Sequence, residues 1–226
     1  MEVKVITVFC FVLSLMSISF AQVVVPLDST DIFEYPKNIF LSVFFPKGIA
    51  EGVALRSYLR SSSWEECRKN VSDRKALDEI FEDADDLCNH NRTAALLASS
   101  VAVLEHKTIP LKLLFGMVIQ LPLTVESQKD FDSRVAKLPV YLYDSKTPDR
   151  DKLQHFFFSA YFMRTLKMNL LVRLLGDAVE IGEDLFIVGG VNDARDRHAN
   201  YDGIRFGESC EKDPLLKPSD YLTPNP

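Results

Sequence analysis

The chain has 226 residues and a formal net charge of −6, with 16 phenylalanines and only nine glycines. Its acidic balance gives no electrostatic reason to bind nucleic acid or an anionic membrane surface, and it has no glycine-rich phosphate loop for a nucleotide. Abundant phenylalanine with few turn residues favours helices with a bulky core over a β-sandwich.

The first residues have the pattern of a secretory signal peptide. Lys4 precedes an uncharged apolar run over residues 5–18, and the small residues Ser19 and Ala21 occupy the −3 and −1 positions of a cleavage site. The apolar run is short for a helix that spans a bilayer. We therefore expect residues 1–21 to be removed and the mature chain to be exported. An uncleaved anchor is the alternative.

Cysteines and glycosylation sequons depend on the compartment. After cleavage Cys67, Cys88 and Cys210 remain. In an oxidising compartment two of them can pair, with Cys67–Cys88 as the local choice, and their spacing has no metal signature. Sequons at Asn70 and Asn91 are relevant only if the chain is a eukaryotic secreted glycoprotein, which is a further alternative.

The N-terminal portion, residues 22–150, is predicted to mix helices and strands. A strand-like run covers residues 38–45. Pro110 and Pro122 break any helix in the apolar stretch that follows residue 108, so two short strands bent at Gly116 are expected there. Apolar periodicity predicts helices over residues 48–60, 73–88 and 93–105.

The polar, turn-rich residues 126–150 form the expected boundary with a C-terminal helical unit. Three helices are predicted there, over residues 151–168, 169–187 and 194–207, followed by a loose Pro-rich tail over 209–226. The expected fold is therefore α+β and predominantly helical: a C-terminal three-helix unit packed on a mixed N-terminal portion with a few strands.

The apolar stretch from residue 156 to 175 contains three cations. Each central cation costs about 2.5–3.5 kcal/mol on insertion scales, against only about 0.3–0.6 kcal/mol gained per large apolar residue. The insertion costs of Arg164, Lys167 and Arg173 therefore argue against a membrane-spanning helix in this stretch. We expect an amphipathic or buried helix instead.

Polar residues recur four positions apart in the three C-terminal helices, and residues at that spacing share one helix face. The pairs are Asp151 with His155, Glu180 with Asp184, and Asp196 with Asn200. Gly203 and Gly207 continue the third face, and because glycine destabilises a helix interior by about 1 kcal/mol relative to alanine, they indicate close packing against another helix.

If these faces meet, they form a polar pocket of the kind that holds metals or catalytic acids in helical bundles. A histidine beside a carboxylate can act as a general base, and a Glu/Asp pair in an apolar setting raises the pKa of one carboxyl group. The candidate catalytic residues are His155, Glu180, Asp184, Asp196 and Asn200. In this hypothesis Asp151 orients the base His155, Glu180 donates a proton or binds a metal, and Asn200 holds the ligand.

A purely structural interpretation of the same residues stands beside this one. Asp151 opens a helix and can serve only as a partner of the helix dipole. His155 can be a core histidine, and Asp196 can pair with Lys152. The cluster would then be a buried hydrogen-bond and salt-bridge network that determines how the helices pack.

The order of these residues resembles the signature of the YfiM-like bacterial envelope proteins. Three parts of the chain contribute to this resemblance: the run Asp151-Lys152-x-x-His155-Phe156, a mid-helix Glu180 with Asp184, and the closing Asp196-x3-Asn200-x2-Gly203-x3-Gly207. More distantly the run is similar to the VanZ-like family, which is associated with glycopeptide resistance and is mostly integral to the membrane. The resemblance covers residues 151–207 and implies a bacterial origin, but no established reaction.

We therefore expect an exported bacterial envelope protein, periplasmic or associated with the outer side of the inner membrane. Its C-terminal site would bind or process a cell-envelope component, and its expected partner is such a component or a membrane protein. Neither nucleic acid nor nucleotide is expected. The sequence specifies no cofactor, leaves metal binding open, and does not decide between an enzyme and a non-catalytic structural or interaction protein.

Overall fold

The structure is a computed structural model. It describes residues 47–112, 118–124, 126–143, 146–167, 194–210, 212–213 and 215–223. The expected signal peptide, the strand-like run at 38–45 and the predicted helix over 169–187 lie outside these residues.

Four helices come first along the described chain: α3 (Ile49–Arg60), α4 (Ser62–Asn70), α5 (Asp73–Leu87) and α6 (Arg92–Ala102). The last three begin at a short polar residue whose side chain accepts a hydrogen bond from a backbone N–H of the first turn, at Ser61, Ser72 and Asn91. Helices α3, α5 and α6 lie where the sequence predicts them, whereas α4 was not predicted.

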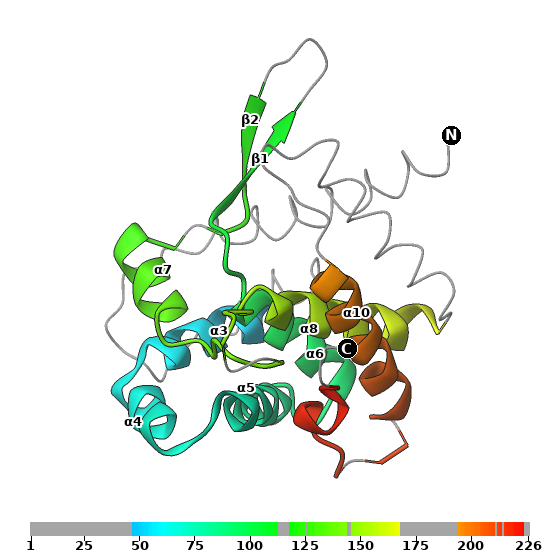
Figure 1. Cartoon of the computed structure of the whole chain (residues 1–226). Helices are drawn as coiled ribbons and strands as arrows, with labels where there is room; N and C mark the ends of the chain where they lie inside the picture. The colour runs from blue at the N-terminus through cyan, green and yellow to red at the C-terminus, as the bar shows by residue number, and fades with distance from the viewer. Residues whose placement is uncertain are drawn as a thin grey trace.

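Helix α6 is the centre of the fold. Every residue from Ala94 to Ala102 is buried, and the helix packs against α3, α5 and α8 (Lys152–Leu166) (Figure 1). Because most of its side chains are alanine, serine or valine, neighbouring helices can approach it from several sides. It therefore joins the N-terminal helices to the C-terminal ones.

The β structure of the described residues is one hairpin. Strands β1 (Thr108–Lys112) and β2 (Val118–Pro122) pair antiparallel, with Ile109 opposite Leu121. The hairpin stands away from the helices and is followed by α7 (Gln128–Val135) (Figure 1). The hairpin lies where the sequence predicts two short strands, and the described part of the chain is predominantly helical, as expected.

The core joins α5 and α8 to α10 (Ala194–Ser209) through contacts between phenylalanine rings. The centroids of Phe81 and Phe157 are 6.3 Å apart, and Phe206 lies 5.3 Å from Phe81 and 5.7 Å from Phe156. Residues on both sides of position 150 thus share one core. Within the described residues, no helix combines the length and apolar character needed to cross a membrane.

Two buried arginines hold the C-terminal end of α6. Arg56 donates from Nε and Nη2 to the Val101 carbonyl oxygen at 2.9 and 2.7 Å. Arg134 donates to the Ala102 carbonyl at 2.8 Å and pairs with Glu126 at 2.7 Å. Since the last carbonyls of a helix have no partner within it, these two side chains satisfy groups that would otherwise be buried without one.

The tail after α10 is anchored. Asp78 of α5 accepts hydrogen bonds from Ser219 N at 2.9 Å and Ser219 Oγ at 2.8 Å, and Asp202 of α10 accepts one from Thr223 N at 3.0 Å. Arg92 donates to the carbonyl oxygens of Cys210, Asp213 and Leu216. The 3-10 helix η2 (Pro218–Tyr221) lies within this segment. The expectation of a loose tail is wrong for these residues, because charged side chains elsewhere satisfy their backbone groups.

The expected local disulfide is not formed, since Cys67 and Cys88 are both thiols. Burial raises the pKa of the Cys88 thiol to about 12, with a smaller contribution from the nearby Glu51 carboxylate. Cys88 is therefore an apolar core residue that stays protonated.

Candidate functional site

Helix α8 begins at Asp151, which acts as its N-cap. The Asp151 carboxylate accepts a hydrogen bond from Lys152 N at 3.1 Å. Lys152, His155 and Ser159 follow at spacings of three and four residues, so they lie on one face of the helix. This face is directed at α10.

Helix α10 runs alongside α8 in the same direction, because the contacts advance together along both helices. A Cβ atom at Gly203 would lie 2.2 Å from the Phe156 carbonyl oxygen, and one at Gly207 would lie 2.5 Å from the Ala160 carbonyl oxygen. These distances confirm the close packing predicted from the two glycines. The approach brings the polar N-terminal halves of both helices within hydrogen-bonding distance of each other.

Lys152 lies at the centre of the cluster. Its Nζ is fully buried, contacts the Asp151 carboxylate at 2.5 Å and donates to Asp196 Oδ1 across the α8–α10 interface. Burial acts to lower the pKa of Lys152, but the hydrogen bonds and charges of Asp151 and Asp196 outweigh it and the pKa is raised. Lys152 is therefore charged and links both carboxylates.

His155 shares Asp196 with Lys152. Its Nε2 lies 3.4 Å from Asp196 Oδ1, and its side chain keeps 18% of its surface exposed. Burial lowers the pKa of His155, and the Lys152 charge lowers it further; the Asp196 charge and a hydrogen bond with Asn200 act in the opposite direction without cancelling the effect. With a pKa below 6.5, the imidazole is neutral at pH 7.

Asn200 completes the cluster one turn after Asp196. Ser159 Oγ donates a hydrogen bond to Asn200 Oδ1 at 2.8 Å, and Asn200 also hydrogen-bonds to His155. Asp196 and Asn200 of α10 thus each have a partner on α8. The cluster combines one neutral base, one buried carboxylate, one buried cation and an amide.

Of the candidate catalytic residues, the structure brings His155, Asp196 and Asn200 together. Asp151 is half exposed and contacts Lys152, so it acts on His155 through its charge rather than as the orienting partner expected from the sequence. Glu180 and Asp184 lie outside the described residues.

Two members of the cluster, Lys152 and Ser159, are not among the site residues predicted from the sequence, where Lys152 appears only as a pairing partner of Asp196. The signal for Ser159 was its position four residues after His155, which places both on one face. The signal for Lys152 was its place between Asp151 and His155 in the motif.

His198 lies apart from this cluster. Its Nε2 is 2.9 Å from the Thr223 carbonyl oxygen, and its ring packs edge-on against Tyr143 at 5.3 Å. In the described part of the chain, histidine, cysteine and carboxylate side chains do not gather in threes as a metal site requires.

The comparisons with known proteins return no match: neither a family model, nor a curated protein, nor a solved structure is similar to this chain. A neutral imidazole next to a carboxylate can accept a proton, and the carboxylate stabilises the imidazolium that forms.

Proposed function

We propose that the chain is an exported bacterial envelope protein and that the α8–α10 cluster is its functional site. His155 would accept a proton or hydrogen bond from a cell-envelope component. The observation that carries this proposal is the position of His155: its Nε2 is 3.4 Å from Asp196, its pKa is lowered by burial, and its side chain is 18% exposed. The signal-peptide pattern and the resemblance of residues 151–207 to the YfiM-like proteins support the location.

In a catalytic form of this proposal, His155 is the general base. It would remove a proton from a hydroxyl or water of the bound component, and Asp196 would stabilise the resulting imidazolium. Asn200 would orient the ring through their hydrogen bond. Lys152 would balance the negative charge of Asp196, because the two are in direct contact in a buried environment.

A direct test measures binding of the exported chain to purified peptidoglycan sacculi and to vesicles of envelope phospholipids. The His155→Gln variant keeps the size and polarity of the side chain but removes the base. The control is His90→Gln, because His90 is an exposed histidine at the turn after α5, away from the cluster. We expect binding to at least one of these fractions, lost in His155→Gln and kept in His90→Gln, with both variants folded.

Two outcomes would contradict the proposal: no binding of the unsubstituted chain to either fraction, or equal binding by both variants. Export has its own measurement, because the mass of the secreted product reports its N-terminus. A product that begins at Gln22 supports removal of residues 1–21.

A second candidate is favoured by Lys152. Its ammonium is fully buried and contacts two carboxylates, and Ser159 and Asn200 also satisfy each other. A polar network whose members are paired in this way can specify helix packing without any chemistry. In that case His155→Gln would lower the stability of the fold and would change no binding.

A further inference from the structure

Two charged side chains near the α8–α10 cluster each have a buried polar atom without a hydrogen-bond partner. These atoms are Oε2 of Glu105, which follows α6, and Nε of Arg150, which directly precedes Asp151. Within the described residues, neither of the two side chains forms a hydrogen bond or a salt bridge. Because buried polar groups in proteins are nearly always paired, this Glu105–Arg150 pair needs an explanation.

Electrostatic interactions place the pair beside the cluster. Burial raises the pKa of the Glu105 carboxyl group, and the charges of Arg150 and Lys152 lower it without cancelling the effect of burial and of Asp151. Since the interaction between two charges weakens with distance, the Glu105 carboxyl group lies near the N-terminal end of α8. Asp151 and Lys152 also act on His155. The Glu105–Arg150 pair therefore adjoins the proposed functional site.

The backbone around both residues is held in place. The carbonyl oxygen of Leu104, directly before Glu105, accepts a hydrogen bond from Arg134 at 2.9 Å. The carbonyl oxygen of Arg150 accepts one from Leu153 N at 3.1 Å. The fold thus fixes the positions of the two residues but leaves their charged ends without a hydrogen-bond partner. Polar groups positioned in advance in this way are typical of a preformed binding site.

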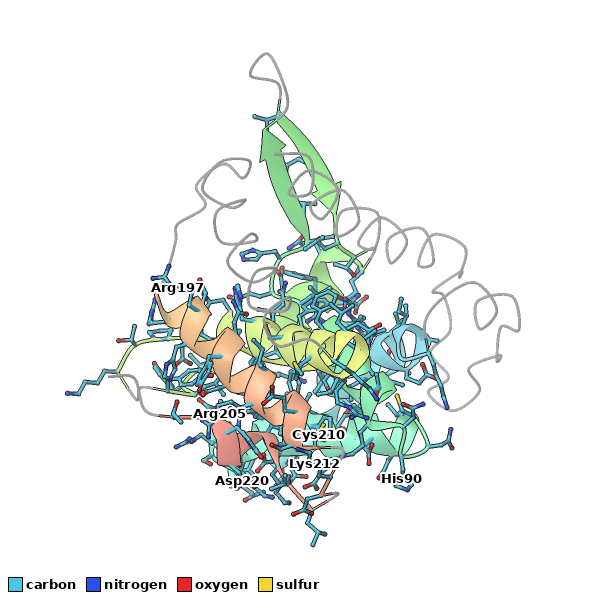
Figure 2. All side chains as sticks on the ribbon, turned by 90° about the vertical axis from the view of Figure 1, so that its right-hand side faces the viewer. His90, Arg197, Arg205, Cys210, Lys212 and Asp220 are labelled. Atoms are coloured by element: carbon cyan, nitrogen blue, oxygen red, sulfur yellow. The ribbon has the colours of Figure 1, made fainter. Side chains whose placement is uncertain are left out.

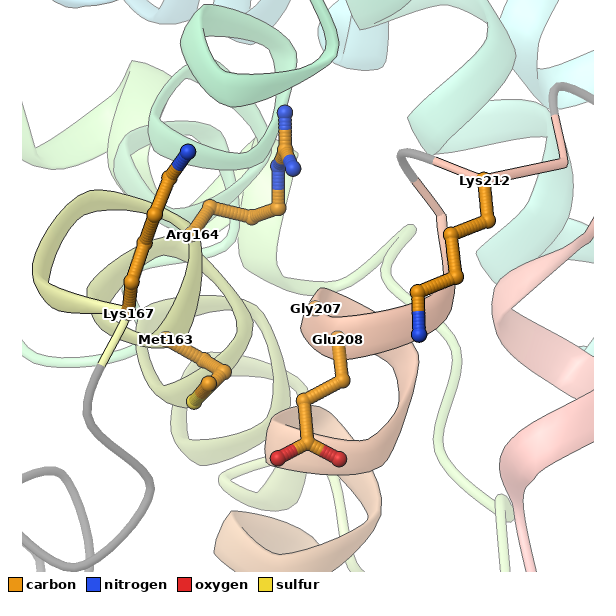
Figure 3. A pocket seen from close by; sticks show the side chains of 6 residues that line it. All are labelled: Met163, Arg164, Lys167, Gly207, Glu208 and Lys212. Carbon is orange, nitrogen blue, oxygen red and sulfur yellow. The ribbon is translucent and has the colours of Figure 1, made fainter.

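The opposite end of the α8–α10 interface differs in this respect. In Figure 2, α10 runs from Arg197, next to Asp196 of the cluster, to Cys210 and Lys212 at its far end. A cavity of about 410 Å³ opens at that far end (Figure 3), lined by Met163, Arg164, Lys167, Gly207, Glu208 and Lys212. Arg164 and Glu208 already have interaction partners. Charges of this cavity are therefore in part satisfied by the chain itself, unlike those of the Glu105–Arg150 pair.

We infer that the Glu105–Arg150 pair binds an amide group of the cell-envelope component, an inference that rests on the function proposed for the α8–α10 cluster. An amide has a donor N–H and an acceptor C=O on separate atoms, so it can donate to Glu105 and accept from Arg150. The two charges of the pair are opposite, so a charged ligand attracted by one is repelled by the other, whereas a neutral amide suits both.

Two envelope structures carry such amides: the acetamido groups of glycan strands and the peptide bonds of the attached peptides. Both occur in peptidoglycan, and neither occurs in envelope phospholipids that lack amide groups. The inference therefore predicts that the chain binds sacculi and does not bind vesicles of such phospholipids.

The test is calorimetric titration of the intact chain with two amide probes, tri-N-acetylchitotriose and acetyl-trialanine amide. The comparison ligand is cellotriose, a sugar trimer with the same linkage that has hydroxyl groups in place of the acetamido groups. We expect at least one amide probe to bind and cellotriose not to bind. The probe that binds distinguishes a glycan source of the amide from a peptide source.

The decisive variant is Glu105→Leu, which removes the buried acceptor. Because burial opposes the charge of this carboxylate, the substitution should keep or stabilise the fold, as thermal unfolding will show. Arg150→Met removes the donor, and Glu66→Leu, at an exposed position on α4, is the control. We expect a dissociation constant raised at least about fivefold by Glu105→Leu and by Arg150→Met, and unchanged by Glu66→Leu.

Binding of neither amide probe, equal binding of cellotriose, or an unchanged dissociation constant in Glu105→Leu would overturn the inference. The sacculi assay separates this failure from that of the proposed function. Sacculi binding that is lost in His155→Gln and kept in Glu105→Leu would remove the amide site and leave the function of His155 standing. Amide binding that depends on Glu105, in a chain that binds neither sacculi nor vesicles, would support the amide site and contradict the envelope function.

Discussion

Gly203 of α10 lies directly against the carbonyl oxygen of Phe156 in α8, where a Cβ atom would stand 2.2 Å from that oxygen. Such a contact cannot be accommodated without moving the backbone of one helix. The α8–α10 cluster therefore depends on this glycine, because the distances between Lys152, His155 and Asp196 exist only at this separation of the helices.

This contact predicts whether a larger residue at position 203 stabilises or destabilises the fold. At an exposed helix position Gly→Ala stabilises by about 1 kcal/mol. Gly203→Ala should instead destabilise by about 1–3 kcal/mol, because the methyl group overpacks the interface against backbone atoms. Urea unfolding followed by circular dichroism measures the difference. A variant as stable as the unsubstituted chain, or more stable, would show that the two helices do not approach this closely.

Removal of the buried cation should be costly. Lys152→Met leaves the Asp196 carboxylate buried without its main partner, and breaking a buried pair in this way destabilises by about 3–5 kcal/mol. Adding Asp196→Asn to the same chain removes the uncompensated charge and should recover a part of that loss. The two single variants and the double variant, compared by urea unfolding, measure the coupling. Additive losses would mean that Lys152 and Asp196 do not interact.

The anchored tail should be released by a single substitution far from it in sequence. Asp78→Ala removes the acceptor of two hydrogen bonds from Ser219 and leaves the Ser219 N–H without this partner. We expect faster proteolytic cleavage and hydrogen exchange in residues 215–223. Asp132→Ala, at an exposed position on α7, is the control. Equal protection of the tail in both variants would contradict the anchoring by Asp78.

The faces of individual helices were predictable from the sequence, because they depend only on local periodicity. Leu77, Ile80, Phe81 and Ala84 of α5 are buried as their spacing predicts. Leu87 continues the same spacing but, as the last residue of α5, is 43% exposed.

Contacts between distant segments were less predictable. Asp78 belongs to an acidic helix, yet it is buried, and it accepts a hydrogen bond from Ser219, 141 residues further along the chain. In the candidate site, spacing grouped His155, Asp196 and Asn200 correctly as neighbours on two faces. The central position of Lys152 depends on the register between α8 and α10, which tertiary packing sets and helical periodicity cannot supply.

The lowered pKa of His155 also determines how stability depends on pH. Because the imidazole is harder to protonate in the folded chain than in the unfolded chain, the unfolded state binds more protons as the pH falls below about 6.5. The free energy of unfolding then decreases relative to that of His155→Gln, and the difference grows until the pH passes below the folded pKa. The comparison with His155→Gln is needed because Asp83, with a pKa raised by burial and by Glu79 to about 6, acts in the opposite direction.

The titration of the His155 ring by NMR tests the central claim most directly. The intact chain is compared with His155→Gln, to assign the resonance, and with Asp196→Asn. We predict a pKa of the His155 imidazole below 6.5, lowered further in Asp196→Asn because the Asp196 carboxylate favours the protonated ring. A pKa at or above 6.5, or one unchanged by Asp196→Asn, would mean that His155 is not a neutral base coupled to Asp196.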